Sequence, residues 1–356
     1  MGAWISGLGL ATPPCTIGQV RAAELAAEVA GYDPVTARFA RAIYAGSGVT
    51  RRAGVVLAER DGVIDSPMLR GATGGGPGTA ARMGVYQSEA GGLACAAARA
   101  ALADASVAGD AVTHLVTASC TGFGAPGVDL ALMDSLGLPA STQRTNVGFM
   151  GCHAAVNALR VARAFAVVDP GAVVLVCCVE LCSLHFQNES RADAVVANAL
   201  FADGAGAVVV TGGARACGLE LRSTASALIP GSSDAMSWSV GDHGFVMSLS
   251  PAVPALVEAH VAPWMTSWLG REGLAPADIA GWAVHPGGPK VLDATERALR
   301  LNATDMAASR EVLAQHGNMS SPTVLFVLDR LRRAARMPAV MLAFGPGLHA
   351  EAALVG

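Results

Sequence analysis

Two stretches of the chain repeat one pattern at matched spacing, and this repeat limits the folds that the sequence can adopt. One stretch opens at Gly151 with GCHAAVNALRVARAFAVVDPGAVVLVCCVE, and the other opens at Gly317 with GNMSSPTVLFVLDRLRRAARMPAVMLAFGPG. Each reads as a glycine, a polar residue, a long helix, a tight loop and a buried strand. The strand follows the glycine at the same distance in both, at Val173 and at Ala339. We therefore predict an internal duplication of one β–α unit.

The segments before each repeat support the duplication and indicate where a site would form. A predicted strand ends at Cys120, 32 residues before Cys152, and another ends at His285, 33 residues before Asn318. Two such halves would bring Cys152 and Asn318 to equivalent helix starts, next to strand-end loops. A junction between halves is a common location for ligand pockets.

The remaining pattern predicts buried helices and strands. The helix expected over 154–168 is apolar nearly all round, with a narrow polar edge, which is typical of a buried helix. In the second unit, Ser321 is expected to cap a helix that continues to about Arg336. Three further segments read as two strands and a buried Ala-rich helix: 3–10, 112–119 and 88–105.

Length and composition exclude several classes of protein. The chain has 356 residues, of which 52% are hydrophobic and 15% charged, so a large core is available and disorder is not expected. Its net charge of -4 argues against nucleic acid as a main partner, because that partner needs a basic surface. We expect no signal peptide, because the N-terminal residues lack its basic and apolar regions, and no run reaches the roughly 18 apolar residues of a membrane span. The eight cysteines are expected as reduced thiols in a cytoplasmic protein.

Three residues at the matched positions fit the chemistry of a cysteine nucleophile. Cys152 lies where a helix begins, and the helix dipole and free N–H groups there are expected to lower the pKa of its thiol. His285, in AVHPGGP, follows a predicted strand, and a nearby imidazolium would lower the pKa of that thiol further. Asn318, in HGNMSS, would offer a neutral N–H donor to a developing oxyanion. Together they indicate nucleophilic catalysis at Cys152.

Each residue type also has an ordinary structural interpretation. A free cysteine is most often a buried packing residue, a histidine after a strand is often a core residue, and an asparagine after glycine is often a turn residue. The other cysteines are read as structural, because Cys177, Cys178 and Cys182 lie in or just after a predicted buried strand. No second pair or nearby histidine completes a metal site with them. The combination at matched places is what favours catalysis.

Five segments resemble signatures of the chalcone-synthase-like type III polyketide synthases, in the order of that family. They are GFMGCHAAVNALRVA, NALFADGAGAVVV, AVHPGGPKVLD, HGNMSSPTVLFVLD and AFGPGLHAEAAL, and they cover most of the chain from about residue 110 to its end. Ketoacyl synthases that start fatty-acid synthesis share a Cys-His-Asn triad, but they do not resemble this sequence at GNMSS and FGPGL. The resemblance is therefore specific to the polyketide synthases.

The resemblance implies a fold and a set of substrates. The expected fold is the α/β thiolase fold, with duplicated αβαβα halves in a five-layered arrangement. Residues 1–212 would form the half that carries the nucleophilic cysteine, and residues 213–356 the half that carries the histidine and asparagine. We expect a homodimer that uses acyl-CoA and malonyl-CoA as substrates, with no metal and no other cofactor.

The resemblance also implies roles for individual residues. Cys152 would be the acyl-carrying nucleophile, with His285 and Asn318 as its catalytic partners. Phe201, in ALFADG, matches a gatekeeping phenylalanine, and Phe245, in HGFVMSL, matches a second one. The further residues expected to contact substrate are Cys120, Thr121, Ala125, Cys182, His185 and Ser320, and the pair expected to bind the phosphates of CoA is Arg51 and Arg52.

Three positions bear on the starter: Thr121, Ala125 and Cys182. At these three positions the chain resembles the bacterial type III polyketide synthases that form long-chain alkylpyrones. A small residue at Ala125 would leave room for an apolar tunnel, in which each buried CH₂ contributes about 0.8 kcal/mol. The resemblance therefore predicts a medium- or long-chain fatty acyl-CoA starter and an alkylpyrone or alkylresorcinol product. Alternatively, Ala125 reflects only the Ala-rich composition and Trp238 or Met236 fills the space, which leaves a short or aromatic starter open.

Two other functions stay open at this point. A single-round ketoacyl synthase would make one carbon–carbon bond and release a β-keto product without a ring. A non-catalytic thiolase-fold subunit would shape a partner enzyme. Such a subunit would be expected to lack the nucleophile, whereas this chain has all three residues of the triad.

Overall fold

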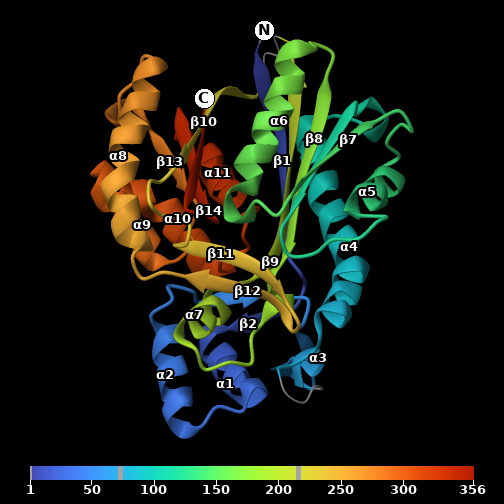
Figure 1. Cartoon of the computed structure of the whole chain (residues 1–356). Coiled ribbons are helices and arrows are strands. Elements are labelled where there is room, and N and C mark those ends of the chain that lie inside the picture. The colour runs from blue at the N-terminus through green and yellow to red at the C-terminus, as the bar shows by residue number, and fades with distance from the viewer. Residues whose placement is uncertain (1, 71–74, 214–217) are drawn as a thin grey trace.

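The computed structural model describes residues 2–70, 75–213 and 218–356. A continuous row of hydrogen-bonded β-strands lies at the centre of the molecule (Figure 1). The strand order is β13-β14-β15-β10-β1-β9-β8-β6-β7. Their bounds are β1 (Ala3–Ala11), β6 (His114–Ser119), β7 (Gln143–Gly148), β8 (Val173–Leu181), β9 (Asp203–Gly212), β10 (Leu219–Leu228), β13 (Gly281–Val284), β14 (Ala339–Gly345) and β15 (His349–Val355).

The strand order repeats outward from the junction of β1 with β10. On one side β1 pairs with β9 and β9 with β8, both antiparallel, and β8 then pairs with β6 in parallel. On the other side β10 pairs with β15 and β15 with β14, both antiparallel, and β14 then pairs with β13 in parallel. The two sheets meet at Trp4↔Glu220 and Ile5↔Leu219. The predicted duplication and the thiolase type of fold are therefore confirmed.

Helices cover both outer faces of the two sheets and fill the space between them (Figure 1). The helices α4 and α5 cover the first sheet, α8 and α9 cover the second, and α6 and α11 lie between, so that five layers result. Within the ranges that the structure describes, no helix is both long and apolar enough to cross a bilayer. The bounds are α4 (Thr79–Ala105), α5 (Val128–Leu136), α6 (Ala154–Val168), α8 (Val253–Arg271), α9 (Pro289–Leu299), α10 (Ala303–His316) and α11 (Thr323–Arg333), with 3₁₀ turns at Gly109–Ala111, Gly151–His153, Cys182–His185 and Pro276–Asp278.

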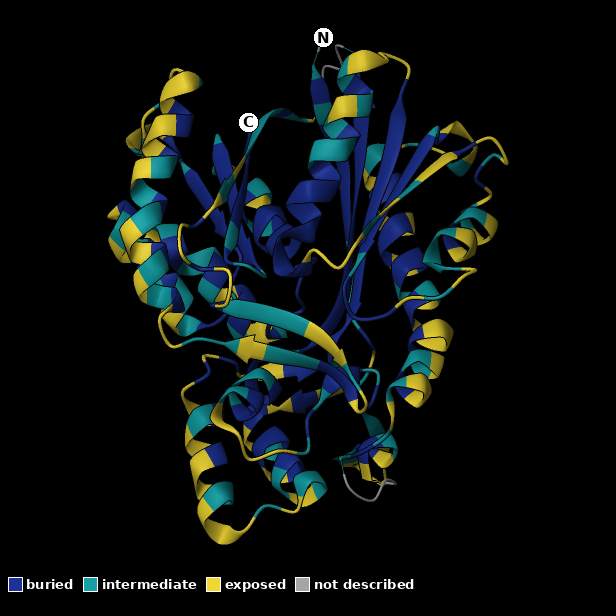
Figure 2. Ribbon diagram, in the orientation of Figure 1, coloured by how far each residue is buried: buried dark blue, intermediate teal, exposed yellow. Residues whose placement is uncertain are grey.

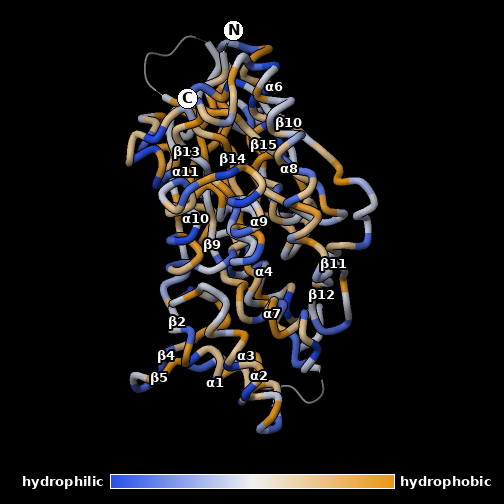
Figure 3. The backbone as a smooth tube through the Cα atoms, turned by 90° about the vertical axis from the view of Figure 1, so that its left-hand side faces the viewer, coloured by the Kyte–Doolittle hydropathy of each residue, from blue (hydrophilic) through white to orange (hydrophobic). Residues whose placement is uncertain are grey.

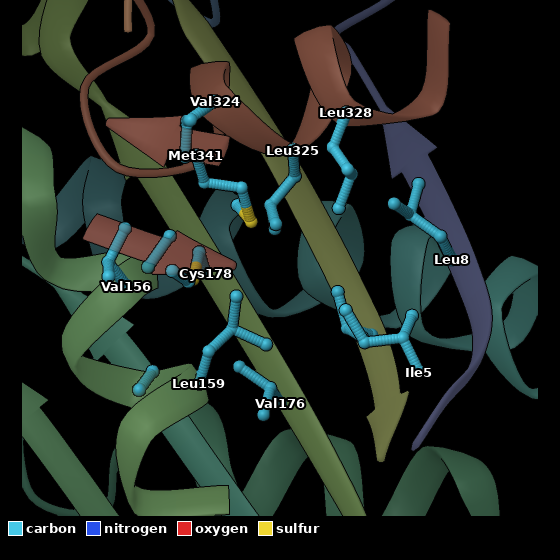
Figure 4. Packing of buried hydrophobic residues seen from close by; sticks show 14 of the residues in the cluster. Ile5, Leu8, Val156, Leu159, Val176, Cys178, Val324, Leu325, Leu328 and Met341 are labelled. Atoms are coloured by element: carbon cyan, nitrogen blue, oxygen red, sulfur yellow. The ribbon is translucent and has the colours of Figure 1, made fainter. Parts of the chain in front are cut away.

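The two central helices are apolar on most of their surface because a sheet covers each side. Figure 4 shows Val156 and Leu159 of α6 and Leu325 and Leu328 of α11 packed against strand residues such as Ile5. Figure 2 shows the same region as the most deeply buried part of the molecule. Along α4 and α8, by contrast, buried residues alternate with exposed ones, because only one side of each helix faces a sheet. A helix that is covered on all sides needs apolar residues all round, which explains the pattern of residues 154–168.

Two glycines of β1 allow α4 to lie directly on the strand. A Cβ at Gly7 would be 2.4 Å from the carbonyl oxygen of Ala101, and a Cβ at Gly9 would be 2.2 Å from that of Ala97. Both alanines are fully buried. Small residues on both elements therefore set this short distance between helix and sheet.

A smaller region lies at the end of the molecule opposite both termini (Figure 1; Figure 3). Its helices α1, α2 and α7 share a core that includes Leu25, Tyr44 and Val195. Between it and the sheets lies the hairpin β11–β12. The bounds are β2 (Thr16–Gly18), α1 (Gln19–Ala30), α2 (Pro34–Ala45), β3 (Arg51–Ala53), β4 (Ala58–Arg60), β5 (Val63–Asp65), α3 (Pro67–Arg70), α7 (Ala192–Leu200), β11 (Met236–Gly241) and β12 (Gly244–Leu249).

Some predicted boundaries differ from the structure. The helix expected to be capped by Ser321 begins at Thr323 and ends at Arg333, and Ser321 does not cap it. Its Oγ instead donates to Oε1 of Glu180 at 2.6 Å, because a buried carboxylate needs donors more than the helix start does. The predicted boundary between 212 and 213 adjoins residues 214–217, which lie outside the described part of the chain.

Candidate active site

Cys152 lies at the start of α6 in the 3₁₀ turn Gly151–His153, with 9% of its surface exposed. The φ of Gly151 is +68°, and a Cβ there would be 2.4 Å from Cδ of Pro346. Only glycine fits this position, because it accepts a positive φ and leaves room for the proline. Pro346 belongs to the loop after β14, so the second half of the chain packs against the turn that carries Cys152.

His285 follows β13, at the carboxyl end of that strand. Its backbone N–H donates to the carbonyl oxygen of Leu342 at 2.7 Å, which holds it beside β14. The side chain is buried, yet neither Nδ1 nor Nε2 has a hydrogen-bond partner among the described residues. An unpartnered buried polar group costs about 1–3 kcal/mol, so this imidazole is suited to a partner that arrives with a substrate.

Asn318 lies in the turn between α10 and α11 and is held by its backbone and its side chain. Its N–H donates to the carbonyl oxygen of Leu200 at 2.8 Å, and its carbonyl oxygen accepts from the N–H of Ala202 at 2.9 Å. The side-chain Oδ1 accepts from the N–H of Ser320 at 2.8 Å, so Nδ2 is left as the donor. That nitrogen makes a long contact of 3.4 Å to the carbonyl oxygen of Gly287, and the side chain also acts on the Cys152 thiol, whose pKa it lowers. The amide therefore has an N–H to offer to an oxyanion.

These three side chains line one cavity of about 580 Å³, which we call the His285 cavity. Cys152 comes from the first half of the chain, and His285 and Asn318 come from the second. The other walls, from α7, β12, α8 and α9, are mostly apolar.

Two further cavities adjoin the first. The Trp238 cavity, of about 310 Å³, is lined by Cys152 together with Cys120, Thr121, Cys182, Ser320, Met236, Trp238 and Met247. The α1 cavity, of about 610 Å³, lies between α1, α7 and the segment 52–69. Cys182 lines the Trp238 and α1 cavities, and Phe201 lines all three. The side chain of Phe201 therefore stands where the three cavities meet.

A buried carboxylate lies behind the Trp238 cavity. Glu180 accepts from the N–H of Cys120 at 2.9 Å and from Oγ1 of Thr121 at 2.7 Å, in addition to Ser321. Burial raises the pKa of Glu180, although these donors act in the opposite direction. Sequence reasoning assigned no role to this residue, but an acidic residue at the end of the run AVVLVCCV was a signal that it needed buried partners.

Burial dominates the electrostatics of the catalytic pair. It raises the pKa of the Cys152 thiol to about 11, which outweighs hydrogen bonding to Ser320 and the expected effect of the helix start. It also lowers the pKa of His285 to about 3, with a smaller contribution from His153. Each group on its own is therefore neutral near neutral pH. A thiolate–imidazolium pair would form only if mutual attraction offset both costs.

Replacing His285 by alanine is expected to remove the reactivity of Cys152 near neutral pH. Because burial holds the pKa of the thiol at about 11, thiolate is lost as the pH falls below that value, and the thiol alone should react only in alkaline solution. In the wild type, His285 can take the proton, so alkylation should depend far less on pH. The measurement is the rate of iodoacetamide alkylation of the Cys152 peptide against pH, with His260→Ala, on α8, as the control. Fast, pH-insensitive alkylation of His285→Ala would mean that another group is the base.

Phe245 and His185 pack together beside the site. Phe245 is fully buried and stacks on His185 with 4.2 Å between ring centroids. His185 lines the α1 cavity, and both its nitrogens are used. Its Nδ1 accepts from the N–H of Phe245 at 2.9 Å, so Nε2 donates to the carbonyl oxygen of Thr121 at 2.7 Å. The roles of both residues at the substrate stay predictions.

The prediction for Arg52 needs correction, whereas that for Ala125 stays a prediction. Ala125 is exposed on the loop between β6 and α5 of the single chain. Arg52 is buried, and its Nη1 donates to the carbonyl oxygens of Asn198 at 2.6 Å and Phe201 at 2.8 Å. A guanidinium engaged with these carbonyl groups is not placed for the phosphates of CoA. Arg51 is exposed, and its role at CoA stays a prediction.

The other substrate positions lie where a substrate could reach them. Cys120, Thr121, Cys182 and Ser320 all line the Trp238 cavity. Met236 and Trp238 also line this cavity, which agrees with the alternative that one of these side chains fills the space of an open tunnel. The indole Nε1 of Trp238 donates to the carbonyl oxygen of Cys120 at 2.7 Å, which fixes the ring. Sequence reasoning missed Met247, because no pattern in β12 marks which face meets the site.

Known proteins of one kind share this sequence and this fold. Two family profiles match, described as the N-terminal domain of chalcone and stilbene synthases over residues 2–214 and their C-terminal domain over residues 220–356. The alpha-pyrone synthesis polyketide synthase-like Pks18 of Mycobacterium tuberculosis is 35% identical over 360 residues, covering 98% of this chain and 90% of the relative. Polyketide synthase 37 of Dictyostelium discoideum is 38% identical over 225 residues, which cover 62% of this chain and 8% of that much longer protein.

Solved structures agree with these relatives. The crystal structure of PKS-I from the brown alga Ectocarpus siliculosus superposes with a TM-score of 0.91 and 28% identity, covering 99% of this chain and 98% of that one. The C-terminal type III polyketide synthase domain of Steely1, a type I/III hybrid from Dictyostelium, superposes with a TM-score of 0.90 and 26% identity over 100% and 99% of the two chains. This chain therefore belongs to the chalcone and stilbene synthase family and is a type III polyketide synthase, a malonyl-CoA-dependent condensing acyltransferase.

Proposed function

We propose that Cys152 carries the acyl chain and that His285 and Asn318 act on malonyl-CoA. One observation carries the proposal: these side chains, from two halves of the chain, line one cavity in which the imidazole of His285 has no hydrogen-bond partner among the described residues. The amide of Asn318, oriented by Ser320, supports it with a second N–H donor. The two N–H donors of His285 and Asn318, directed at one oxygen, would stabilise the negative charge of an enolate.

The proposed reaction has three steps: loading, decarboxylation and condensation. The Cys152 sulfur, after giving its proton to His285, attacks the acyl-CoA carbonyl, and the C–S bond to CoA breaks as the CoA thiol leaves with that proton. Malonyl-CoA then loses CO₂, and the electron pair of the broken C–C bond forms an enolate held by His285 and Asn318. The enolate carbon attacks the acyl thioester, a C–C bond forms, and the Cys152 thiolate leaves. Repeated extension and ring closure would release the product.

Product analysis tests this proposal against its alternatives. Mass spectrometry of products made from a starter CoA and malonyl-CoA should show chains extended more than once and closed into rings. A single β-keto product would instead indicate a single-round ketoacyl synthase. No turnover without an added protein would favour a non-catalytic partner subunit. A cytoplasmic location and the absence of any cofactor stay predictions.

The favoured starter is a medium- or long-chain fatty acyl-CoA, with an alkylpyrone or alkylresorcinol as product. Support comes from the α1 cavity, which adjoins the Trp238 cavity at Cys182 and Phe201 and has mostly apolar walls, including Ala22 and Ala26. An acyl group on Cys152 that passes Cys182 would enter this space. The relative from Mycobacterium tuberculosis, named for alpha-pyrone synthesis, agrees with this class of product.

Filling the α1 cavity should shorten the range of starters. Ala26→Phe places a ring on the wall of the α1 cavity, so long-chain starters should lose on the order of fourfold in kcat/KM per methylene excluded, while short starters keep their values. Val20→Phe is the matched control, because Val20 lies on the same helix and is 80% exposed. The measurement is kcat/KM against acyl length. A wild type that prefers acetyl-CoA, or an Ala26→Phe profile equal to the control, would contradict the long-chain starter.

We also propose a homodimer formed through the edge of the first sheet. Among the described strands, β7 pairs with β6 alone, so its other edge offers backbone groups to a second copy. Beside it Phe123, Phe149 and Met150 are 57%, 41% and 38% exposed and form an apolar patch. Light scattering should give twice the chain mass of 35.8 kDa, and Phe149→Glu should lower it. A wild-type mass of one chain would contradict the dimer.

A further inference from the structure

A chain of buried polar side chains runs from the residue after Cys152 into the second sheet. Nδ1 of His153 lies 2.7 Å from Oδ1 of Asn157, and Nδ2 of Asn157 donates to Oε1 of Glu351 at 3.0 Å. These three residues, which we call the Glu351 network, are 2%, 7% and 2% exposed. Glu351 also accepts from Arg160 and from Oγ of Ser226, the latter at 2.7 Å. The network thus links α6 of the first half to β15 and β10 of the second.

The bonds of the network determine the tautomer of His153. The carboxylate of Glu351 can only accept hydrogen bonds, so the Asn157 atom that faces it must be the amide nitrogen. The other Asn157 atom is then the oxygen, which also only accepts, and Nδ1 of His153 must carry the hydrogen. In the neutral ring, Nε2 holds the lone pair. One buried carboxylate therefore sets both the orientation and the tautomer of the ring next to Cys152.

The His153 ring is also held from the opposite side. A Cβ at Gly345 would lie 2.3 Å from Cδ2 of His153, so the ring rests directly on the backbone at the end of β14. The next residue, Pro346, touches Gly151 on the other side of Cys152. Residues on both sides of Cys152 in one 3₁₀ turn are therefore fixed by the half of the chain that supplies His285. A change in the ring position would move the thiol relative to its partners.

The charged and titratable groups around His153 come from every element packed on it. They are Glu351 and His349 of β15, Arg160 of α6, and His285 after β13, with Cys152 beside it. Burial lowers the pKa of His153 most, while Asn157 and Glu351 act in the opposite direction. The ring is thus neutral near neutral pH. A second positive charge here would oppose transfer of the Cys152 proton to His285.

We propose that the Glu351 network is a positioning device: Glu351 and Asn157 hold the His153 ring, and the ring holds the Cys152 turn in register with His285 and Asn318. None of the three touches a reacting atom, so they are positioning residues. The inference rests on the proposed function, since it concerns the position of the proposed nucleophile, Cys152. Alkylation of the Cys152 thiol tests it without any step of the condensation.

The test compares two substitutions that keep side-chain bulk but remove hydrogen bonds. Asn157→Leu removes both bonds of the network, and His153→Phe keeps a ring on Gly345 without the Nδ1–H donor. Each should lower the rate of iodoacetamide alkylation at Cys152 near neutral pH by roughly ten- to hundredfold, because small misplacements cost about that much. The kcat for acyl loading of Cys152 should fall in parallel with little change in KM. Arg163→Gln is the matched control, because Arg163 bonds from α6 to the carbonyl oxygens of Leu221 and Arg222 outside the network.

A paired substitution guards against loss of fold. In Asn157→Asp combined with Glu351→Gln, the new carboxylate still accepts from His153 and the new amide donates to that carboxylate, so one bond keeps its direction, the other is reversed, and both are kept. Alkylation should recover to within a few-fold of wild type, with its pH profile moved because a negative charge now adjoins His153. Wild-type alkylation in His153→Phe, or no recovery in a paired variant that melts like wild type, would overturn the proposal. If alkylation depends on the network but the wild type does not decarboxylate malonyl-CoA, the positioning role remains and the proposed function is contradicted instead.

Discussion

Cys152→Ala is expected to abolish covalent loading and polyketide formation. Among the cysteines that the structure describes, Cys152 is the one at the start of a helix that shares a cavity with His285 and Asn318, and alanine offers no sulfur for the thioester. Intact-protein mass after incubation with an acyl-CoA should show one adduct in the wild type and none in the variant. Loss of the nucleophile should leave no measurable condensation.

Two other cysteines provide the matched controls. Cys120 and Cys182 line the Trp238 cavity beside Cys152, and burial raises the pKa of both thiols well above the usual value. Cys120 also lies 3.3 Å from Oε1 of Glu180, so its thiolate would face a carboxylate. Cys120→Ala and Cys182→Ala should therefore keep the adduct. Mapping of the acyl group to either residue would disprove the assignment of the nucleophile.

Asn318→Ala should separate loading from decarboxylation. Removal of one oxyanion donor typically costs about 10²–10³ in rate, so CO₂ release from malonyl-CoA should fall by about that factor. Loading of the starter should persist, because Cys152 and His285 are intact. Radiolabelled CO₂ measures the first effect, and the adduct mass measures the second.

The control for Asn318 is an asparagine of the same half with a structural role. Asn302 caps α10 through the N–H groups of Thr304 and Asp305. Asn302→Ala should lower stability by about 1 kcal/mol without a comparable loss of decarboxylation. Near-normal CO₂ release by Asn318→Ala would contradict its role at the enolate.

The repeated spacing in the sequence was sufficient to predict the duplication, and the family resemblance supplied the thiolase type of fold. The glycine-to-strand distance was correct in both units, because β8 begins at Val173 and β14 at Ala339. The predicted strand ends at Cys120 and His285 were one residue beyond β6 and β13. Local propensity and apolar periodicity suffice here, since central helices and strands must be apolar on every covered face.

The roles of residues near the site were harder to predict, because burial decides them. Arg52 and Arg51 are neighbours in sequence, but the first lies inside and binds two carbonyl groups while the second is exposed. The hairpin β11–β12 places Phe245 against His185, a contact that no local pattern indicates. A resemblance carries residue types to positions, but not the direction in which each side chain points.

The sequence by itself determined the duplication and the three residues that share the His285 cavity, because these depend on spacing and on residue type, and its motifs implied the thiolase type of fold through the family resemblance. The tertiary structure alone decided which side chains face that cavity and how Cys152 is held. His153 and Glu351 are 198 positions apart, and no local pattern links them. They meet through Asn157 only because the two halves pack together, and that contact fixes the ring next to the nucleophile. Long-range packing thus sets the geometry and electrostatics of a site whose residues the sequence had already supplied.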